Sequence, residues 1–213
     1  MKRKLIIALA LCLALALGIG GTMAYLTATT GPVVNTFTIG NVGLKLVETE
    51  NGAEVTAKSY KIVPGETVDK DPTVTVTTGS EPCWLFVKVT EDLGDLNNVF
   101  NPETDGKFFT YDLAEGWTKL TGITGVDNVY YRTVGVETAD SAIGSSILVL
   151  AGNTAYPNGV VTLSDKITQS MSEVLADADA DKPTLTFKAA AVQYANVADE
   201  VAAYNSLPDA FKG

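Results

Sequence analysis

Short runs in which apolar and polar residues alternate, separated by turn-forming residues, constrain this chain more than any other feature. Thr73 to Thr77 alternates strictly and has high β propensity. Cys83 to Val89 is more continuously apolar, which predicts a strand in the middle of a sandwich. Asn101-Pro102 and Tyr156-Pro157-Asn158-Gly159 predict turns. Further strands are predicted at 37–46 with a bulge at Gly40-Asn41, and at 54–63, 129–136, 146–150, 159–163 and 184–194. Many short strands joined by such turns indicate an all-β sandwich or barrel.

Two stretches predict short helices at the periphery. Ser170 to Ala176 is short and weakly patterned. The second stretch places Val197, Val201, Tyr204 and Leu207 at helical spacing. We expect this second helix to dock on the sheet.

The N-terminus predicts a secretory signal peptide. Lys2-Arg3-Lys4 precedes an apolar run of 15 residues from Leu5 to Ile19. Thr22 and Ala24 are small residues at positions −3 and −1 of a cleavage site between Ala24 and Tyr25. A transmembrane helix needs roughly 18 apolar residues, more than this run offers. The alternatives are an uncleaved anchor and a lipid anchor at Cys12, where a bulky Leu11 stands in place of the expected small residue.

Charge narrows the expected partners. The 213 residues less the 24 of the signal leave 189, which suits one domain. The 15 basic residues less the three in the signal leave 12 against 25 acidic ones, a net charge of −13. Nucleic acid and anionic membranes are therefore not expected as partners, because this charge repels their phosphates. We expect a secreted protein that is free of the membrane after cleavage.

The composition argues against an enzyme. With no histidine, the chain lacks the Ser-His-Asp triad, the Cys-His dyad and the HExxH zinc site. Cys83, the one cysteine after the signal, lies next to Trp84 in an apolar run and is predicted to be a small core residue. No phosphate-binding glycine motif occurs. We expect no catalytic, cofactor-binding or metal-binding residues.

One acidic stretch resembles the start of a calcium loop. Asp177, Asp179 and Asp181 alternate, but Lys182 and Lys188 stand where the glycine and the bidentate glutamate of an EF-hand belong. A solvated acidic loop is the favoured interpretation. Weak surface binding of calcium is the alternative.

Motifs near the N-terminus carry a family resemblance. Gly20-Gly21-Thr22-Met23-Ala24-Tyr25-Leu26-Thr27 resembles GGTxAYFTD, and Asn35 to Val42 resembles NTFTAGxL. The chain thereby resembles the TasA and camelysin family, whose signals a dedicated signal peptidase (SipW) processes. Looser matches are Val63-Pro64-Gly65, Ser80 to Trp84 and Phe187 to Gln193. Leu26 and Ala28 depart from the motif, which leaves open whether the dedicated peptidase or a general one cuts.

The resemblance implies a jelly-roll β-sandwich that is secreted and joins biofilm matrix fibres by donor-strand exchange. It also implies that the partners are copies of the same chain or related matrix subunits, with a signal peptidase acting during export. The predicted organisation is a signal at 1–24, an N-terminal arm at 25–36 and a sandwich at 37–213. Candidate donor residues in the arm are Tyr25, Leu26, Val33 and Val34. The other interpretation of the arm is a loose terminus or a strand within its own sheet.

A second function remains open from the sequence. A monomeric surface module that binds a glycan or a host protein would place aromatic or polar residues on its loops. Trp117 and Tyr130-Tyr131 are the candidates for such a site, although paired aromatics on strands more often pack in a core.

Overall fold

A computed structural model describes residues 41–137 and 141–213 of the protein. In these residues the chain is mostly β structure, arranged as three antiparallel sheets. The first sheet has the order β2-β1-β4-β9, the second β3-β10-β6 and the third β11-β5-β8-β7. The strands are β1 (Leu44–Glu50), β2 (Ala53–Val55), β3 (Thr67–Asp69), β4 (Thr73–Val76), β5 (Cys83–Asp92), β6 (Phe109–Thr110), β7 (Thr118–Lys119), β8 (Val129–Val134), β9 (Ser146–Leu148), β10 (Val160–Leu163) and β11 (Thr184–Gln193).

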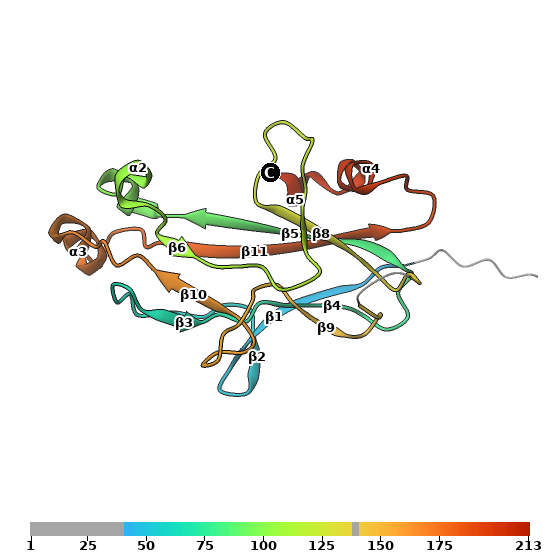
Figure 1. The fold of residues 1–213 in the computed structure, drawn as a ribbon, viewed down its shortest axis with the longest axis horizontal. Coiled ribbons are helices and arrows are strands. Elements are labelled where there is room, and N and C mark those ends of the chain that lie inside the picture. The colour runs from blue at the N-terminus through green and yellow to red at the C-terminus, as the bar shows by residue number, and fades with distance from the viewer. Residues whose placement is uncertain (1–40, 138–140) are drawn as a thin grey trace, which may run out of the picture. The chain divides into compact units, whose positions relative to one another are not determined.

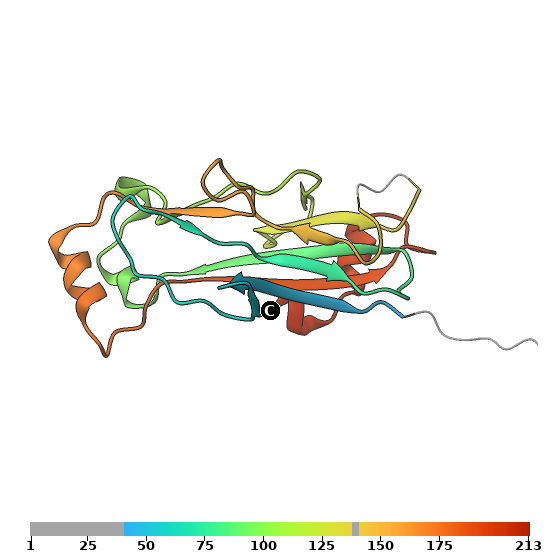
Figure 2. The ribbon, with the colours of Figure 1, turned by 90° about the horizontal axis from the view of Figure 1, so that it is seen from below.

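The sheets form two layers around one apolar core. β1, β4, β9, β3 and β10 lie in the lower layer of Figure 1, and β5, β8 and β11 lie in the upper layer. Figure 2 shows the same layers from below. Fully buried side chains of β4 and β5, such as Val74 and Leu85, meet between them. The predicted all-β sandwich is confirmed at this level.

The central strand of the third sheet is β5. It pairs with β11 over ten residues and with β8 over six. The N–H of Tyr194 donates to the Pro82 carbonyl at 2.8 Å, and the N–H of Val89 donates to that of Asn128 at 2.9 Å. Because ladder bonds alternate along an antiparallel pair, even-numbered residues of β5 bond to β11 and odd-numbered ones to β8. The same alternation makes even-numbered residues of β11 bond to β5.

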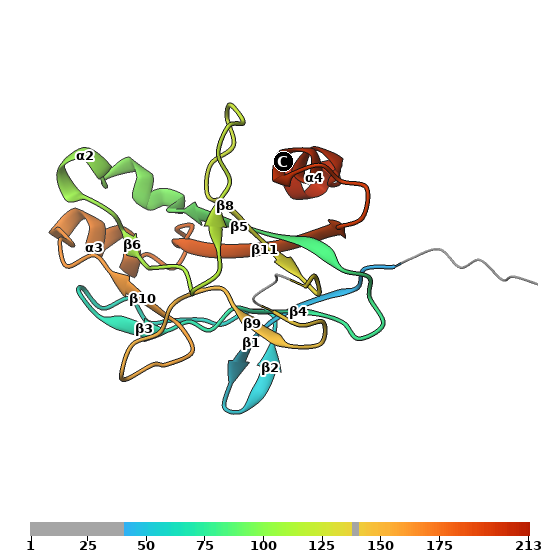
Figure 3. The same ribbon diagram turned by 45° about the vertical axis from the view of Figure 1, so that its right-hand side comes forward.

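Two C-terminal helices cover the outer face of the third sheet. α4 (Glu200–Ser206) begins after Asp199, whose carboxylate accepts the N–H of Ala202 at 2.8 Å. α5 (Asp209–Lys212) follows it. Tyr204 packs with Phe86 of β5, at a centroid separation of 6.0 Å. Figure 3 shows both helices on that face. The predicted docking of this helix is confirmed, although the helix is shorter than 197–207 because its N-cap lies at Asp199.

The other helical elements lie toward the opposite end of the sandwich (Figure 1). α3 (Gln169–Ala176) confirms the helix predicted at Ser170 to Ala176 and is capped by Thr168. A 3₁₀ helix, η1 (Gly94–Asn98), and α2 (Pro102–Asp105) were not predicted. At α2 the side chain of Asn101 accepts the N–H of Glu103 at 3.0 Å, so Asn101-Pro102 starts a helical turn rather than a simple reverse turn.

One predicted strand is wrong in extent. Of the run 54–63, only the first residues belong to β2, and the chain from 57 to 62 joins no sheet. Its alternation survives as alternating burial, with Lys58, Tyr60 and Ile62 more buried than their neighbours. The short strands β3, β6 and β7 carry too few residues for a period-two pattern and were not predicted.

The predictions for the N-terminus lie outside the described residues. They comprise the signal at 1–24, the cleavage site between Ala24 and Tyr25, the arm at 25–36 with Leu26, Val33 and Val34, and the first part of the strand at 37–46. From Val42 onward that strand is observed, and Val42, Leu44 and Leu46 pack on the core as expected. Among the described residues, no helix is both long and apolar enough to cross a membrane.

Candidate functional site

The outer side of β11 carries no strand ladder in the described residues, although β1 lies close to β11. Within residues 41–137 and 141–213, β11 forms a ladder with β5 only. Its even-numbered residues bond to β5, so the N–H and C=O groups of its odd-numbered residues point away from the sheet. These outward residues are Leu185, Phe187, Ala189, Ala191 and Gln193. An edge of this length offers a row of hydrogen-bonding groups to another extended chain.

A large apolar cavity of about 1090 Å³ borders the first half of this edge. Its walls come from both layers of the sandwich and from the chain that connects β2 with β3. Apolar side chains make up the larger part of the lining, and charged ones such as Glu48, Lys58 and Lys70 lie among them. The lining includes Leu46 and Glu48 of β1, Lys58, Tyr60 and Ile62 of the connection, Val68, Lys70 and Pro72 around β3, and Leu185 and Phe187 of β11. We call this cavity the groove.

Residues 57–62, which we call the strap, form one wall of the groove. Figure 2 shows the strap running from the β1–β2 hairpin toward the turn before β3. Lys58, Tyr60 and Ile62 are half-buried on its inner side, whereas Ala57, Ser59 and Lys61 are exposed. Among the described residues, the main chain of the strap makes no hydrogen bond to other main-chain groups. The strap therefore has the side-chain alternation of a strand without its ladder.

Side chains hold the strap in place. The Nζ of Lys58 lies 2.6 Å from Oδ1 of Asp71 and 4.0 Å from a carboxylate oxygen of Asp69. The hydroxyl of Tyr60 donates to the main-chain carbonyl of Asp69 at 2.7 Å. Both oxygens of Asp71 also accept the N–H of Thr49 at 3.1 Å. One buried carboxylate thus joins β1 to the strap.

A second buried ion pair lies beside the first. The Nζ of Lys70 lies 2.6 Å from Oε1 of Glu48, and both side chains are about one-tenth exposed. The same Nζ lies 5.5 Å from the ring centroids of Tyr60 and of Phe187. A cation over two rings links the strap to β11 through a cation–π contact on each side.

This environment shifts two pKa values. Burial raises the pKa of Tyr60, and the negative charges of Glu48, Asp69 and Asp71 raise it further. Burial also tends to raise the pKa of Asp71, but the hydrogen bonds from Lys58 and Thr49 outweigh it and hold this pKa below its ordinary value. Asp71 is therefore charged and paired at neutral pH.

Sequence reasoning missed these polar groups because they are scattered over three segments. A signal was nonetheless present, since Glu48 continues the inward phase of Leu44 and Leu46, and Lys58 shares the phase of Tyr60 and Ile62. A charged residue at a position where the alternation places inward-facing apolar residues predicts a buried ion pair or a binding site.

The predicted core cysteine is confirmed. Cys83 is 0% exposed at the start of β5, and burial raises the pKa of its thiol to about 11. A thiol in this state is protonated at neutral pH and is a poor nucleophile.

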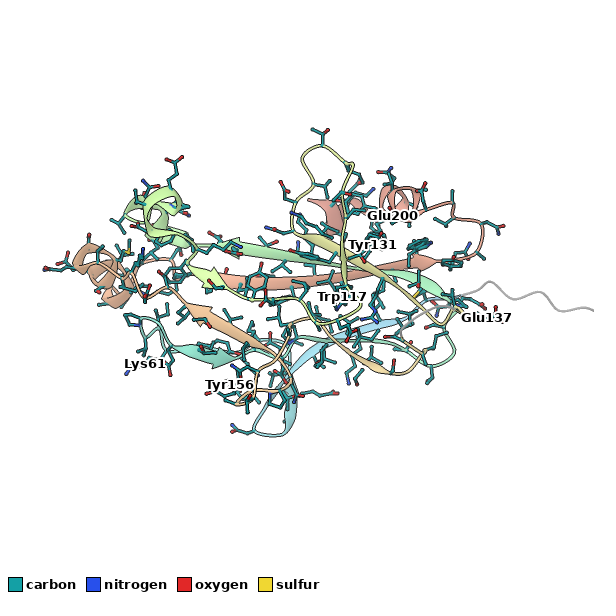
Figure 4. The ribbon with its side chains drawn as sticks, in the orientation of Figure 1. Lys61, Trp117, Tyr131, Glu137, Tyr156 and Glu200 are labelled. Carbon is teal, nitrogen blue, oxygen red and sulfur yellow. The ribbon has the colours of Figure 1, made fainter. Side chains whose placement is uncertain are left out.

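The aromatic residues considered for a loop site pack on the two cores instead. The indole N–H of Trp117 donates to the Leu148 carbonyl at 2.8 Å. Trp117 and Tyr130 pack on the main core, and Tyr131 packs on the smaller core beneath α4. Figure 4 shows Trp117 between the layers and Tyr131 on the side of Glu200 in α4.

The acidic stretch 177–181 lies between α3 and β11. The Nζ of Lys182 donates hydrogen bonds to the carbonyls of Val174, Leu175 and Asp177 at the C-terminal end of α3. A carboxylate oxygen of Asp95 accepts the N–H of Asp181 at 2.9 Å. In the described part of the chain, no three His, Cys, Asp or Glu residues are grouped so as to hold a metal ion.

A second cavity of about 730 Å³ lies at the far end of β11, lined by Glu81, Pro82, Val136, Glu137, Gln193, Tyr194 and Ala195. Tyr194 is 39% exposed and stacks on Trp84 with ring centroids 5.3 Å apart. The described chain begins at this end, where the Asn41 carbonyl accepts the N–H of Glu81 at 2.9 Å. Figure 4 shows Lys61 of the strap and Glu137 of this cavity at opposite ends of the sandwich.

Comparison with known proteins adds no relative, since no family model, no curated protein and no solved structure matches this chain.

Proposed function

We propose that the protein is a non-enzymatic, secreted subunit of extracellular matrix fibres, with a jelly-roll sandwich that assembles by donor-strand exchange. The observation that carries the proposal is the ten-residue β11 edge, unpaired on its outer side in the described part of the chain, next to an apolar groove. An incoming strand would form a ladder with β11 and place alternate side chains in the groove.

The N-terminal arm supplies a donor of suitable chemistry. Residues 25–36 contain no charged side chain and are rich in Thr and Val. A segment of 12 residues spans roughly 40 Å when extended, longer than the roughly 33 Å of a ten-residue strand. An uncharged donor also avoids burying unpaired charge in the groove.

The two ends of the domain suit head-to-tail assembly. The described chain starts at Asn41, beside Tyr194 and the end of β11, whereas the groove lies beside Leu185 and Phe187 at its beginning. An arm that leaves one end of a subunit and enters the other end of the next makes a heterologous contact. Such a contact does not close on itself, so it gives filaments.

The test compares the mature protein, 25–213, with a variant that starts at Asn35. We expect filaments by negative-stain electron microscopy from the first and none from the second, with circular dichroism unchanged. Val33→Asp or Val34→Asp should likewise block filaments, because a buried unpaired carboxylate is strongly unfavourable. Normal filaments from the shortened variant would overturn donor-strand assembly.

Two further measurements bear on the remainder of the proposal. N-terminal sequencing of the secreted protein should begin at Tyr25, and another start would move the boundary of the arm. The purified protein should not cleave casein, and chelator-sensitive cleavage absent from a mock purification would contradict a non-enzymatic role.

A monomeric surface-binding module is the alternative. Trp117, Tyr130 and Tyr131 pack in the cores, so they do not provide the loop site that this alternative requires. A mature protein that stays monomeric at all concentrations and binds a glycan would favour it.

A further inference from the structure

The strap forms one wall of the space that a donor strand would enter. It lines the groove together with Leu185 and Phe187 of the open β11 edge. Its inward side chains, Lys58, Tyr60 and Ile62, follow the two-residue period with which a strand would fill the groove. A donor that packs on Leu185 and Phe187 would therefore meet the inward side chains of the strap.

The strap has little main-chain attachment to lose. No main-chain hydrogen bond to another main-chain group holds residues 57–62 in the described structure. Its exposed residues Ala57, Ser59 and Lys61 leave the backbone open to water. Releasing the strap therefore breaks side-chain contacts only.

Those contacts form a compact latch of three interactions. They are the Lys58–Asp71 ion pair, the hydrogen bond from Tyr60 to the Asp69 carbonyl, and the Lys70 ammonium between the rings of Tyr60 and Phe187. When the strap leaves, Asp71 keeps the Thr49 N–H and Lys70 keeps Glu48. The Lys70–Glu48 pair thus stays intact, whereas Asp71 loses its cation, and this loss is the main cost of release.

A donor strand can form main-chain hydrogen bonds with β11, which the strap does not form in the described structure. The five outward residues of β11 each offer one N–H and one C=O, and a donor that runs along them can form a ladder with both kinds of group. The strap also fills its space incompletely, because a cavity of about 1090 Å³ remains beside it. An extended, uncharged segment that pairs with β11 can fill more of this space than the strap does.

We infer that the strap, residues 57–62, is a displaceable plug that covers the groove of the free subunit and is expelled when the arm of another copy enters. This inference rests on the proposed function and adds a control step to it. The plug shields the apolar groove before assembly, and the latch sets how fast a donor enters.

Trypsin provides a direct readout, because the strap contains Lys58 and Lys61. The experiment uses the domain 37–213, which lacks the arm, and a synthetic peptide of residues 25–36. Proteases need a locally unfolded segment, so cleavage after Lys61 reports release of the strap. We expect saturating peptide to speed this cleavage by about tenfold, as for loss of one charged hydrogen bond.

Matched variants separate the latch from general effects. Lys58→Gln removes the ion pair to Asp71, whereas Lys45→Gln removes an exposed pair to Glu54 on the neighbouring hairpin. We expect Lys58→Gln to raise the association rate of the peptide by about tenfold and Lys45→Gln to leave it within about twofold. Tyr60→Phe, which removes the hydroxyl that bonds to the Asp69 carbonyl, serves as a second latch variant should Lys58→Gln fold poorly.

The outcomes distinguish this inference from the proposed function. Peptide binding with unchanged cleavage after Lys61, and equal rates for all variants, would overturn the plug and leave donor-strand assembly standing. Absence of peptide binding to every variant, together with absence of filaments from the mature protein, would overturn both.

Discussion

β5 and β11 are neighbouring strands of equal length, but β5 is paired on both sides and β11 on one side only among the described residues. Both have ten residues, and they pair along their whole length. β5 also bonds to β8, and its Leu85, Phe86 and Val87 are 0% exposed. β11 has a ladder on one side only among the described residues, and its side chains are half-buried or exposed. A strand completed on both sides belongs to the fold, whereas a strand completed on one side retains bonding capacity for another chain.

Proline substitution on the two sides of β11 tests this difference with the largest expected effect. Ala190 faces Phe86 in the β5 ladder, so Ala190→Pro should cost roughly 3 kcal/mol in the free energy of unfolding. Ala189 points its N–H outward, so Ala189→Pro should cost less than about 1 kcal/mol and still block filaments. Urea denaturation and negative-stain microscopy measure the two effects. Equal destabilisation by both variants would show that the outer side of β11 is not free.

The pH dependence of stability tests how completely the Cys83 thiol at the start of β5 is buried. Burial raises the pKa of the Cys83 thiol from 9.0 to about 11, so the folded state holds this proton more tightly than the unfolded state. Its contribution is fully present below pH 9 and is lost as the pH rises toward 11, with a loss on the order of 2 kcal/mol. Urea denaturation of the wild type and of Cys83→Ala at pH 8 and 11 isolates the effect. A parallel pH profile for the two proteins would contradict burial of the thiol.

A substitution at Asp71 tests the contact between the strap and the rest of the domain, where we expect a smaller effect on stability. Asp71→Asn weakens the contacts with Lys58 and Thr49 and should cost about 1 to 2 kcal/mol at pH 7. Since the pKa of Asp71 is held low in the fold, its contribution is present above the ordinary carboxyl pKa of 3.8 and is lost as the pH falls through the folded value. The two proteins should therefore converge in acid. A difference that persists unchanged at pH 2 would mean that charge is not its cause.

The smallest effect on stability is expected for the exposed Lys45–Glu54 ion pair. Both side chains are about half exposed, so Lys45→Ala should change stability by less than about 0.5 kcal/mol. Urea denaturation at low and high salt measures it. A cost above 1 kcal/mol would indicate that the β1–β2 hairpin contributes more to the fold than its exposure suggests.

Several elements were predictable because their pattern is local. The alternation of Thr73 to Thr77 and the apolar run from Cys83 gave β4 and β5, and the spacing of Val201, Tyr204 and Leu207 indicated the helix over the outer face. The short strands β3, β6 and β7 were not predictable, because two or three residues hold no period and form strands only where a neighbour offers a ladder. The family resemblance, the export signal and the arm remain predictions, since they rest on residues outside the described range.

By itself, the sequence determined which side chains turn inward, because in an extended chain neighbouring side chains point to opposite sides whatever surrounds them. It thereby specified the core of β4 and β5 and the burial of Cys83. Only the tertiary structure decided which extended segments acquire partners. The side chains of residues 57–62 alternate as those of β4 do, yet this segment lies beside the groove and forms no ladder in the described structure. β11 is the edge strand of its sheet, although nothing in its sequence pattern distinguishes it from a strand paired on both sides. The reason is physical: side-chain phase follows from local backbone geometry, whereas a main-chain hydrogen bond needs a second chain segment brought within about 3 Å, which depends on the path of the whole chain.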